Sequence, residues 1–166
     1  PAMFAPELIA SAEALLNACR SRNLKITAAE SCTGGLVTGI LTEIPGASEA
    51  FDRGFVTYSN AAKSEMLGVP APVIARHGAV SAAVALAMVE GALKHAPADV
   101  AVAITGIAGP DGGTIQKPVG LVYIAAHRKG GDAVAHRFNF TSGTRHGIRM
   151  ESVREALRLA LEAVQQ

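Results

Sequence analysis

The sequence is poor in several residue types, and each shortage excludes a class of protein. It has no tryptophan, only 4% aromatic residues, and two cysteines, too few for a disulfide framework. Lys and Arg number 15 against 14 Asp and Glu, so the net charge of +1 offers no electrostatic footprint for a nucleic acid. No apolar run reaches the roughly 18 residues of a membrane span. We therefore expect no nucleic-acid partner, no membrane partner, and a cytoplasmic location.

The histidines form no pattern typical of a metal site or of a catalytic base. The chain has no HxH or HExxH motif and no Cys/His cluster with the spacing of metal ligands. The five are expected in a loop, at a helix end, at a strand end, inside a strand and in a first helical turn: His77, His95, His127, His136 and His146. We predict structural or surface roles for them, no metal ion and no cofactor.

What the chain has in quantity is Ala, Val, Ile and Leu, in alternating strand and helix patterns. The length of 166 residues fits one domain, residues 1–166. Strands are predicted at residues 24–29, 54–59, 100–104, 119–126 and 133–140, and helices at residues 6–19, 35–41, 61–67, 82–94 and 145–164, with Asn60 and Ser81 as N-caps.

The last two strands are joined by a hairpin-like connection, which makes them antiparallel neighbours. This pattern predicts an α/β fold, a three-layer α/β/α sandwich on a mixed, mostly parallel sheet of about five strands with an antiparallel strand. The Ala-rich helices could pack across a subunit boundary, so we also expect a homo-oligomer.

The most informative segment is residues 26–36, where a strand is expected to lead directly into a helix. Open α/β sheets bind ligands beyond the carboxyl ends of their strands, and the N–H groups of a helix start attract anions. Ser31 is therefore a candidate nucleophile, with an oxyanion held by the N–H groups of that helix start, and Thr33, Gly34 and Gly35 are candidate substrate-binding residues. Ser31 could instead be an N-cap, and Cys32 either the true nucleophile or a buried packing residue.

A serine nucleophile needs a base, and no histidine is expected near these strand ends. By elimination Lys63 is the candidate base, because burial can lower the pKa of an ammonium group toward neutrality. Tyr58 would assist, either by relaying the proton or by fixing Ser31 through a hydrogen bond. The alternatives are a solvated surface charge for Lys63 and a half-buried strand residue for Tyr58.

Two further strand ends carry candidate ligands for a phosphate. Residues 105–113 form a glycine-rich loop candidate in which Thr105, Gly106 and Gly109 could bind substrate through backbone amides, although it matches no standard phosphate-binding motif. Arg145, near the start of the last helix, could clamp a phosphate, or could instead form an ion pair with Glu30 or Asp111.

Taken together, four motifs in one order make the chain similar to a known family. The sequence resembles the C-terminal domain of the CinA competence/damage-inducible family in the segments 29–35, 54–60 with Lys63, 78–81, and 105–113 with 117–120.

The resemblance implies hydrolysis of nicotinamide mononucleotide to nicotinic acid mononucleotide and ammonia, by a metal-free serine amidohydrolase acting on a small nucleotide substrate. It implies catalytic roles for Ser31, Tyr58 and Lys63, matches the family's threonine and arginine with Thr105 and Arg145, and implies a three-layer sandwich over a mixed sheet. The alternatives are a non-catalytic nucleotide-binding or interaction module and an amidase for another small amide.

Overall fold

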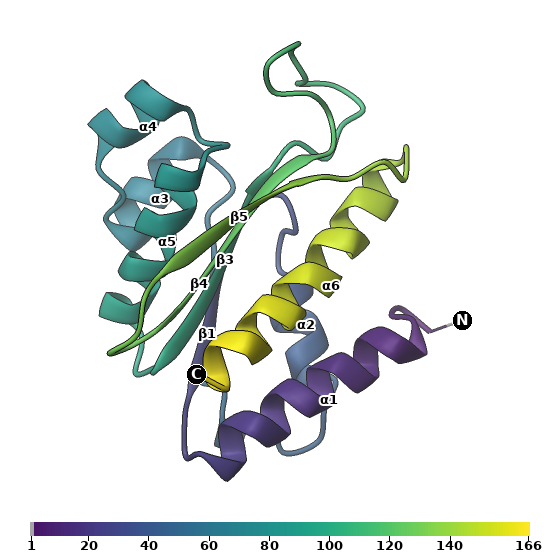
Figure 1. Ribbon diagram of the computed structural model, residues 1–166, viewed down its shortest axis with the longest axis vertical. Helices are drawn as coiled ribbons and strands as arrows, with labels where there is room; N and C mark the ends of the chain where they lie inside the picture. The colour runs from purple at the N-terminus through teal and green to yellow at the C-terminus, as the bar shows by residue number, and fades with distance from the viewer. Residues whose placement is uncertain (1) are drawn as a thin grey trace.

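The computed structural model describes residues 2–166, in which a five-stranded sheet is covered on both faces by helices (Figure 1). In chain order the elements are α1 (Pro6–Ser21), β1 (Ile26–Glu30), α2 (Leu36–Thr42), the 3-10 helix η1 (Ala47–Glu49), β2 (Phe55–Val56), α3 (Asn60–Leu67), α4 (Ala71–His77), α5 (Ala82–His95), β3 (Val100–Gly106), β4 (Leu121–Arg128), β5 (Val134–Asn139) and α6 (Arg145–Val164).

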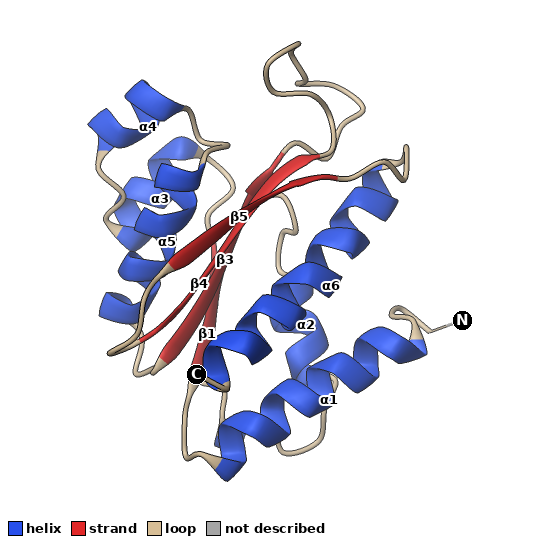
Figure 2. Cartoon of the chain, in the orientation of Figure 1, coloured by secondary structure: helices blue, strands red, loops and turns tan. Residues whose placement is uncertain are grey.

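The strand order across the sheet is β2-β1-β3-β4-β5. Figure 2 shows the strands in red between the two groups of helices in blue. β1 is parallel to both of its neighbours, whereas β4 is antiparallel to β3 and to β5. β4 is thus the one strand of this sheet that runs against the others. The predicted mixed, mostly parallel sheet is confirmed, and so is the hairpin between the last two strands.

Alternation of side chains along β3 explains why the two faces of the sheet carry different helices. Val100, Val102 and Ile104 pack into a core with residues of α1, α2 and α6, while Ala101 and Ala103 pack into a second core with α3, α4 and α5. Successive side chains of a strand point to opposite faces, so one apolar strand supplies both cores. The result is the predicted three-layer sandwich, with the helices separated into two groups by the sheet (Figure 1).

The second strand is much shorter than predicted. β2 spans only Phe55–Val56, although the pattern favoured residues 54–59. The Thr57 N–H still donates to the Glu30 carbonyl of β1 at 2.8 Å, but the Thr57 carbonyl accepts a hydrogen bond from Lys63 Nζ. The chain leaves the sheet there to begin α3, because a side chain takes over the backbone acceptor.

The helix caps agree with the predictions at one of two positions. Ser81 caps α5, since its hydroxyl accepts from the Val84 N–H at 3.2 Å. The predicted cap Asn60 is wrong by one residue: Ser59 is the cap of α3, its hydroxyl accepting from the Ala62 N–H at 3.0 Å, and Asn60 is the first helical residue. Both residue types favour this position, and only the backbone path of residue 59 selects the serine.

A short helix is present where the sequence predicted a loop. α4 ends at His77, the histidine expected in a loop, and begins after Pro70. Proline is compatible with a first helical turn, because the backbone N–H that it lacks would have no intrahelical partner there.

The glycine-rich loop starts later than predicted. Thr105 and Gly106 belong to β3, where they pair with Tyr123 and Val122 of β4. Pairing with the antiparallel neighbour extends the strand, and the loop itself runs over residues 107–120.

Gly91 of α5 yields a test of the packing between α3 and α5. A Cβ atom added there would lie 2.0 Å from the Leu67 carbonyl oxygen. A backbone oxygen cannot move aside cheaply, so we expect Gly91→Ala to lower the free energy of unfolding by about 1–3 kcal/mol, measured by urea denaturation. The matched control is Gly39→Ala in α2, whose nearest neighbour would be Phe4 Cζ at 4.0 Å. That change should stabilise the protein by up to about 1 kcal/mol, and equal effects at both sites would contradict the close contact.

Candidate functional site

Ser31 lies immediately after β1, at the carboxyl end of the parallel part of the sheet. Its backbone N–H donates to the Ile104 carbonyl of β3 at 3.0 Å, and its own carbonyl accepts from the Gly34 N–H at 3.0 Å. Gly34 and Gly35 have φ values of +58° and +106°, which glycine adopts without strain. The glycines therefore serve the tight turn that leads from β1 into α2. Residues 31–34 are called the nucleophile turn below.

Glu30, which the sequence suggested only as a partner for Arg145, caps α2. Its buried carboxylate accepts from the backbone N–H groups of Val37 and Thr38, at 2.9 and 3.0 Å, and from the hydroxyls of Thr33 and Thr38, at 2.7 and 3.0 Å. Ser31 is thus not the cap of this helix. The expectation that the first amides of α2 hold an oxyanion is wrong for these two N–H groups, because the carboxylate already occupies them.

Lys63 reaches Ser31 from α3. Its Nζ lies 3.1 Å from Ser31 Oγ and 2.9 Å from the Thr57 carbonyl oxygen. Only 1% of Lys63 and 8% of Ser31 is exposed to solvent, so the alternative of a solvated surface lysine is wrong. Burial lowers the pKa of Lys63 from its ordinary value of 10.5, since a charged ammonium is disfavoured away from water, and the nearby Cys32 acts in the opposite sense. A neutral amine in this position can accept the Ser31 proton.

Cys32, the rival nucleophile, is a buried residue. It is 6% exposed and belongs to the core on the α1 and α6 side of the sheet. Burial raises the pKa of its thiol to about 11. The thiolate is the reactive form, so at neutral pH this side chain is a poor nucleophile.

Tyr58 and Arg145 meet on the solvent side of the site. Arg145 Nη2 donates to the Tyr58 hydroxyl at 2.9 Å, and Nη1 donates to the Gly109 carbonyl oxygen at 2.6 Å. Tyr58 is 61% exposed, more than the half-buried strand position considered as its alternative. Its hydroxyl thus contacts Arg145, and the structure gives it no hydrogen bond to Ser31 within residues 2–166.

Thr105 and Thr33 use their hydroxyls inside the protein. Thr105 Oγ1 donates to the Ala79 carbonyl at 2.8 Å, which ties the end of β3 to the turn before α5. Thr33 is fully buried, with its hydroxyl on Glu30. Their side chains are therefore structural, and a substrate contact with Thr105 would have to use its backbone or the surface beside it.

An open cleft of about 210 Å³ brings the candidate residues together. Its lining comprises Ser31, Cys32, Tyr58, Asn60, Lys63, Ala79, Val80, Thr105, Gly106, Ala108 and Arg145. Four of the predicted site residues do not belong to this lining within residues 2–166: Thr33, Gly34, Gly35 and Gly109. The glycines shape the turn and the loop behind the cleft instead.

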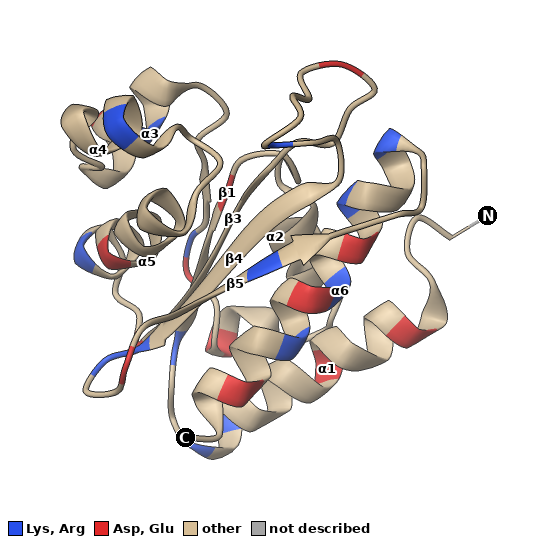
Figure 3. Ribbon diagram, turned by 45° about the horizontal axis from the view of Figure 1, so that its top comes forward, with Lys and Arg blue, Asp and Glu red and all other residues tan. Residues whose placement is uncertain are grey.

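The cleft carries positive charge. Within residues 2–166, the salt bridges involve neither Arg145, which lines the cleft, nor Arg149, one helical turn later; both donate to backbone or hydroxyl oxygens. Arg145 and Arg149 belong to the first two turns of α6. Figure 3 shows basic residues at this end of the helix, near the loop of residues 107–120. Uncompensated cations favour an anionic ligand.

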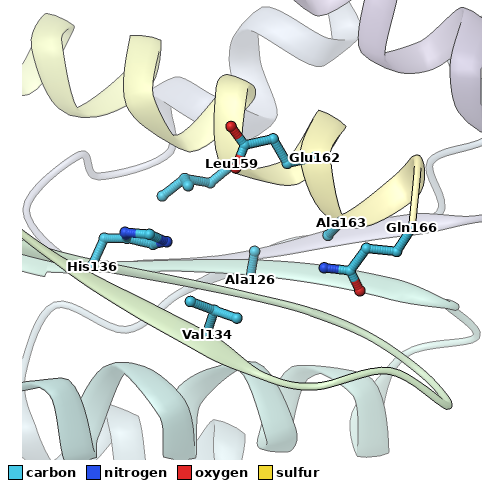
Figure 4. A pocket seen from close by; sticks show the side chains of 7 residues that line it. All are labelled: Ala126, Val134, His136, Leu159, Glu162, Ala163 and Gln166. Atoms are coloured by element: carbon cyan, nitrogen blue, oxygen red, sulfur yellow. The ribbon is translucent and has the colours of Figure 1, made fainter.

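A second hollow, of about 50 Å³, lies between the last two strands and the C-terminal half of α6 (Figure 4). It is lined by Ala126, Val134, His136, Leu159, Glu162, Ala163 and Gln166. It is too small for an organic substrate, and its carboxylate, Glu162, is already paired with Arg158 at 2.8 Å. This hollow offers no competing reaction site.

Residues 2–166 hold no candidate metal site and no candidate membrane span. No group of three or more His, Cys, Asp and Glu side chains there could hold a metal ion. None of the five histidines lines the cleft. In the same part of the chain, no helix combines the length and the apolar character that crossing a bilayer requires.

Sequence reasoning missed two charged residues of the site. Glu30 adjoins Ser31, and a carboxylate next to a helix start is a recognisable signal for a cap. Arg149 donates from α6 to the carbonyls of the nucleophile turn, more than 110 residues away in the sequence. No local pattern could have indicated that contact.

Comparisons with known proteins agree with this geometry. A family model described as the CinA C-terminal domain matches residues 9–164. The chain is 48% identical over 151 residues to nicotinamide-nucleotide amidohydrolase PncC of Escherichia coli K12, a match that covers 91% of each protein. It is 53% identical over 130 residues to a CinA-like protein of Geobacter sp. strain M21, covering 78% of this chain and 31% of that longer relative.

Solved structures are similar over the whole chain. The crystal structure of the competence/damage inducible protein CihA from Agrobacterium tumefaciens has a TM-score of 0.96 and 44% identity, and the match covers 100% of both chains. A CinA superfamily protein from Escherichia coli has a TM-score of 0.89 and 34% identity, covering 97% of this chain and 94% of that one. These matches confirm the α/β sandwich.

The burial of Lys63 predicts a pH dependence of stability. Between the lowered pKa of native Lys63 and its unfolded value near 10.5, the unfolded chain binds a proton that the native protein lacks. Stability therefore rises with pH across that window. In Lys63→Met this rise should be missing, so the free energy of unfolding of the wild type should increase relative to that of the variant as the pH rises toward 10.5.

Urea denaturation of the wild type and the variant at a series of pH values measures the difference between their free energies of unfolding. The contributions of all other titrating groups cancel in this difference. The matched control is Lys94→Met, because Lys94 lies on the exposed end of α5. Its curve should run parallel to that of the wild type. A parallel curve for Lys63→Met as well would mean that the pKa of Lys63 is not lowered.

Proposed function

Because the chain belongs to the CinA C-terminal domain family, we propose that it hydrolyses nicotinamide mononucleotide to nicotinic acid mononucleotide and ammonia. The Escherichia coli relative that matches along 91% of its length is named for this class of reaction, and like it this chain is a hydrolase that acts on an amide bond. The observation that carries the proposed mechanism is the 3.1 Å contact between the buried Lys63 Nζ and Ser31 Oγ, in a cleft that Arg145 also lines.

In the first half of the reaction, Ser31 Oγ attacks the carboxamide carbon while its proton passes to the neutral Lys63 amine. The Thr57 carbonyl accepts another Nζ proton at 2.9 Å, which aims the nitrogen lone pair at Ser31. Lys63 then gives its proton to the departing nitrogen, which leaves as ammonia. This leaves a nicotinoyl ester on Ser31.

In the second half, a water molecule attacks that ester with Lys63 again as the base. Its hydroxyl joins the acyl carbon and Ser31 recovers its proton, so the products are the carboxylic acid and free enzyme. Each tetrahedral intermediate carries an oxyanion. We assign its stabilisation to the backbone N–H of Cys32, the residue after the nucleophile, since the amides of Val37 and Thr38 are occupied.

The phosphate of the substrate is assigned to Arg145. This guanidinium lies at the mouth of the cleft, and its present contacts are two neutral oxygens, from Tyr58 and Gly109. A phosphate offers a stronger, charge-assisted partner for the same donors. Tyr58 keeps its proposed role as the assisting residue, and its hydroxyl would be released toward the substrate when Arg145 turns to the phosphate.

The direct test incubates chelator-treated protein with nicotinamide mononucleotide and measures ammonia and nicotinic acid mononucleotide. We expect Ser31→Ala to lower turnover by roughly three orders of magnitude or more, because the acyl group then has no acceptor. Cys32→Ala is the matched control in the neighbouring position, and it should retain most of the activity. The reverse pattern would identify a thiol enzyme, and binding without turnover in the wild type would indicate a nucleotide-binding module.

A second test concerns the phosphate. Arg145→Met should lower kcat/KM for nicotinamide mononucleotide by about 10- to 100-fold, the equivalent of one charged hydrogen-bond partner. It should leave the rate on nicotinamide riboside, which lacks the phosphate, nearly unchanged. Arg137→Met, on the exposed face of β5, is the control. Equal losses on the two substrates would show that Arg145 does not recognise the phosphate.

A further inference from the structure

Arg149, in the second turn of α6, contacts the nucleophile turn, which Lys63 reaches from α3. Its Nε donates to the Cys32 carbonyl at 3.0 Å and its Nη2 to the Thr33 carbonyl at 3.2 Å. Arg145 lies one helical turn earlier and faces the same cleft. The start of α6 thus delivers one guanidinium to the cleft mouth and one to the backbone that carries Ser31.

These contacts restrain the peptide units on both sides of Thr33. A peptide unit is planar, so holding its carbonyl also sets the direction of its N–H. Arg149 holds the Thr33 carbonyl, whose peptide unit carries the Gly34 N–H. That N–H donates to the Ser31 carbonyl at 3.0 Å, and the peptide unit of this carbonyl carries the Cys32 N–H. The backbone N–H of Cys32, together with Ser31 itself, is thereby given one orientation.

Two observations set Arg149 apart from an ordinary surface arginine. It has no carboxylate partner among the salt bridges of residues 2–166, so its charge is directed at the two carbonyl dipoles. Its Nη2 also packs against Gly34, where an added Cβ would lie at 3.3 Å. A side chain at position 34 would crowd the guanidinium as well as strain the turn.

We propose that Arg149 is a positioning residue for amide hydrolysis: by holding the Cys32 and Thr33 carbonyls it orients Ser31 Oγ and the Cys32 N–H that receives the oxyanion. This role rests on the proposed function. In this mechanism Arg149 makes no contact with the substrate. It acts on the reaction by fixing the backbone of the nucleophile turn.

The kinetic test compares Arg149→Ala with the wild type on nicotinamide mononucleotide. We expect kcat to fall by about 10- to 100-fold, the effect of misplacing a reacting group or an oxyanion donor. KM and the Kd of the product nicotinic acid mononucleotide should change by less than about threefold, since binding groups are untouched. Guanidinium ions, at concentrations far below those that unfold the protein, should restore part of kcat.

Arg154→Ala is the matched control. Arg154 lies on the same helix, exposed, in a loose ion pair with Glu7 at 3.7 Å. It should keep the wild-type kcat and show no response to guanidinium. Both variants are assayed below the onset of unfolding measured by circular dichroism, so that a loss of stability does not enter the comparison.

A second readout needs no knowledge of the substrate. A fluorophosphonate reacts with an activated serine: Ser31 Oγ bonds to phosphorus, fluoride leaves, the hydroxyl proton passes to Lys63, and the phosphoryl oxygen takes the oxyanion position. Mass spectrometry should show labelling of Ser31 slowed in Arg149→Ala by about the same factor as kcat. If the wild type is labelled but leaves nicotinamide mononucleotide intact, the proposed substrate is wrong and the comparison of labelling rates still decides the role of Arg149.

Three results would overturn the proposal. Wild-type kcat and labelling rates in Arg149→Ala would show that the turn needs no such support. A raised KM with unchanged kcat would make Arg149 a direct substrate ligand. A loss of kcat that guanidinium does not restore, with an equal loss of product binding, would mean a general collapse of the cleft.

Discussion

The buried contact between Lys63 and Ser31 is the constraint on which the rest of the site depends. By residue volume, Lys63 is the largest of the fully buried side chains of residues 2–166. An amine so far from water must have polar partners, and it has two, Ser31 Oγ and the Thr57 carbonyl. The second partner draws a backbone acceptor away from the sheet. This ends β2 after two residues and brings α3 against the carboxyl end of β1.

The nucleophile turn is held by opposite charges from its two sides. Glu30 takes the N–H groups at the start of α2, where a helix would otherwise attract an anion, and Arg149 takes carbonyls of the turn. The carboxylate thereby occupies the positive N-terminus of α2, so that this helix end does not attract an anion into the cleft. The positive character of the cleft then comes from a side chain on another element, Arg145 of α6.

The two arginines at the start of α6 extend this arrangement outward. Arg145 links Tyr58 to the loop that follows β3, and Arg149 links α6 to the turn that follows β1. One helix thus joins segments that follow three strands of the sheet. The site is built at the edge where parallel strands end, as expected for an open α/β sheet.

Much of the fold could be read from local patterns, because apolar periodicity and hairpin spacing act over a few residues. The helix and strand order, the Ser81 cap and the β4–β5 hairpin are of this kind. Boundaries set by distant partners could not be read in this way. β3 continues through Gly106 because β4 pairs with it, and β2 stops early because Lys63 reaches back to Thr57.

The sequence by itself determined the family, the layered α/β fold and the set of candidates Ser31, Tyr58, Lys63 and Arg145, since these follow from motifs and periodicity. Only the tertiary structure decided which of these side chains are buried and which of them meet. Whether a lysine is a solvated charge or a buried amine depends on the water excluded by the elements around it, and so does the raised pKa of the Cys32 thiol. Glu30 and Arg149 joined the site for the same reason: hydrogen bonds between segments far apart in the chain exist only once the chain has folded.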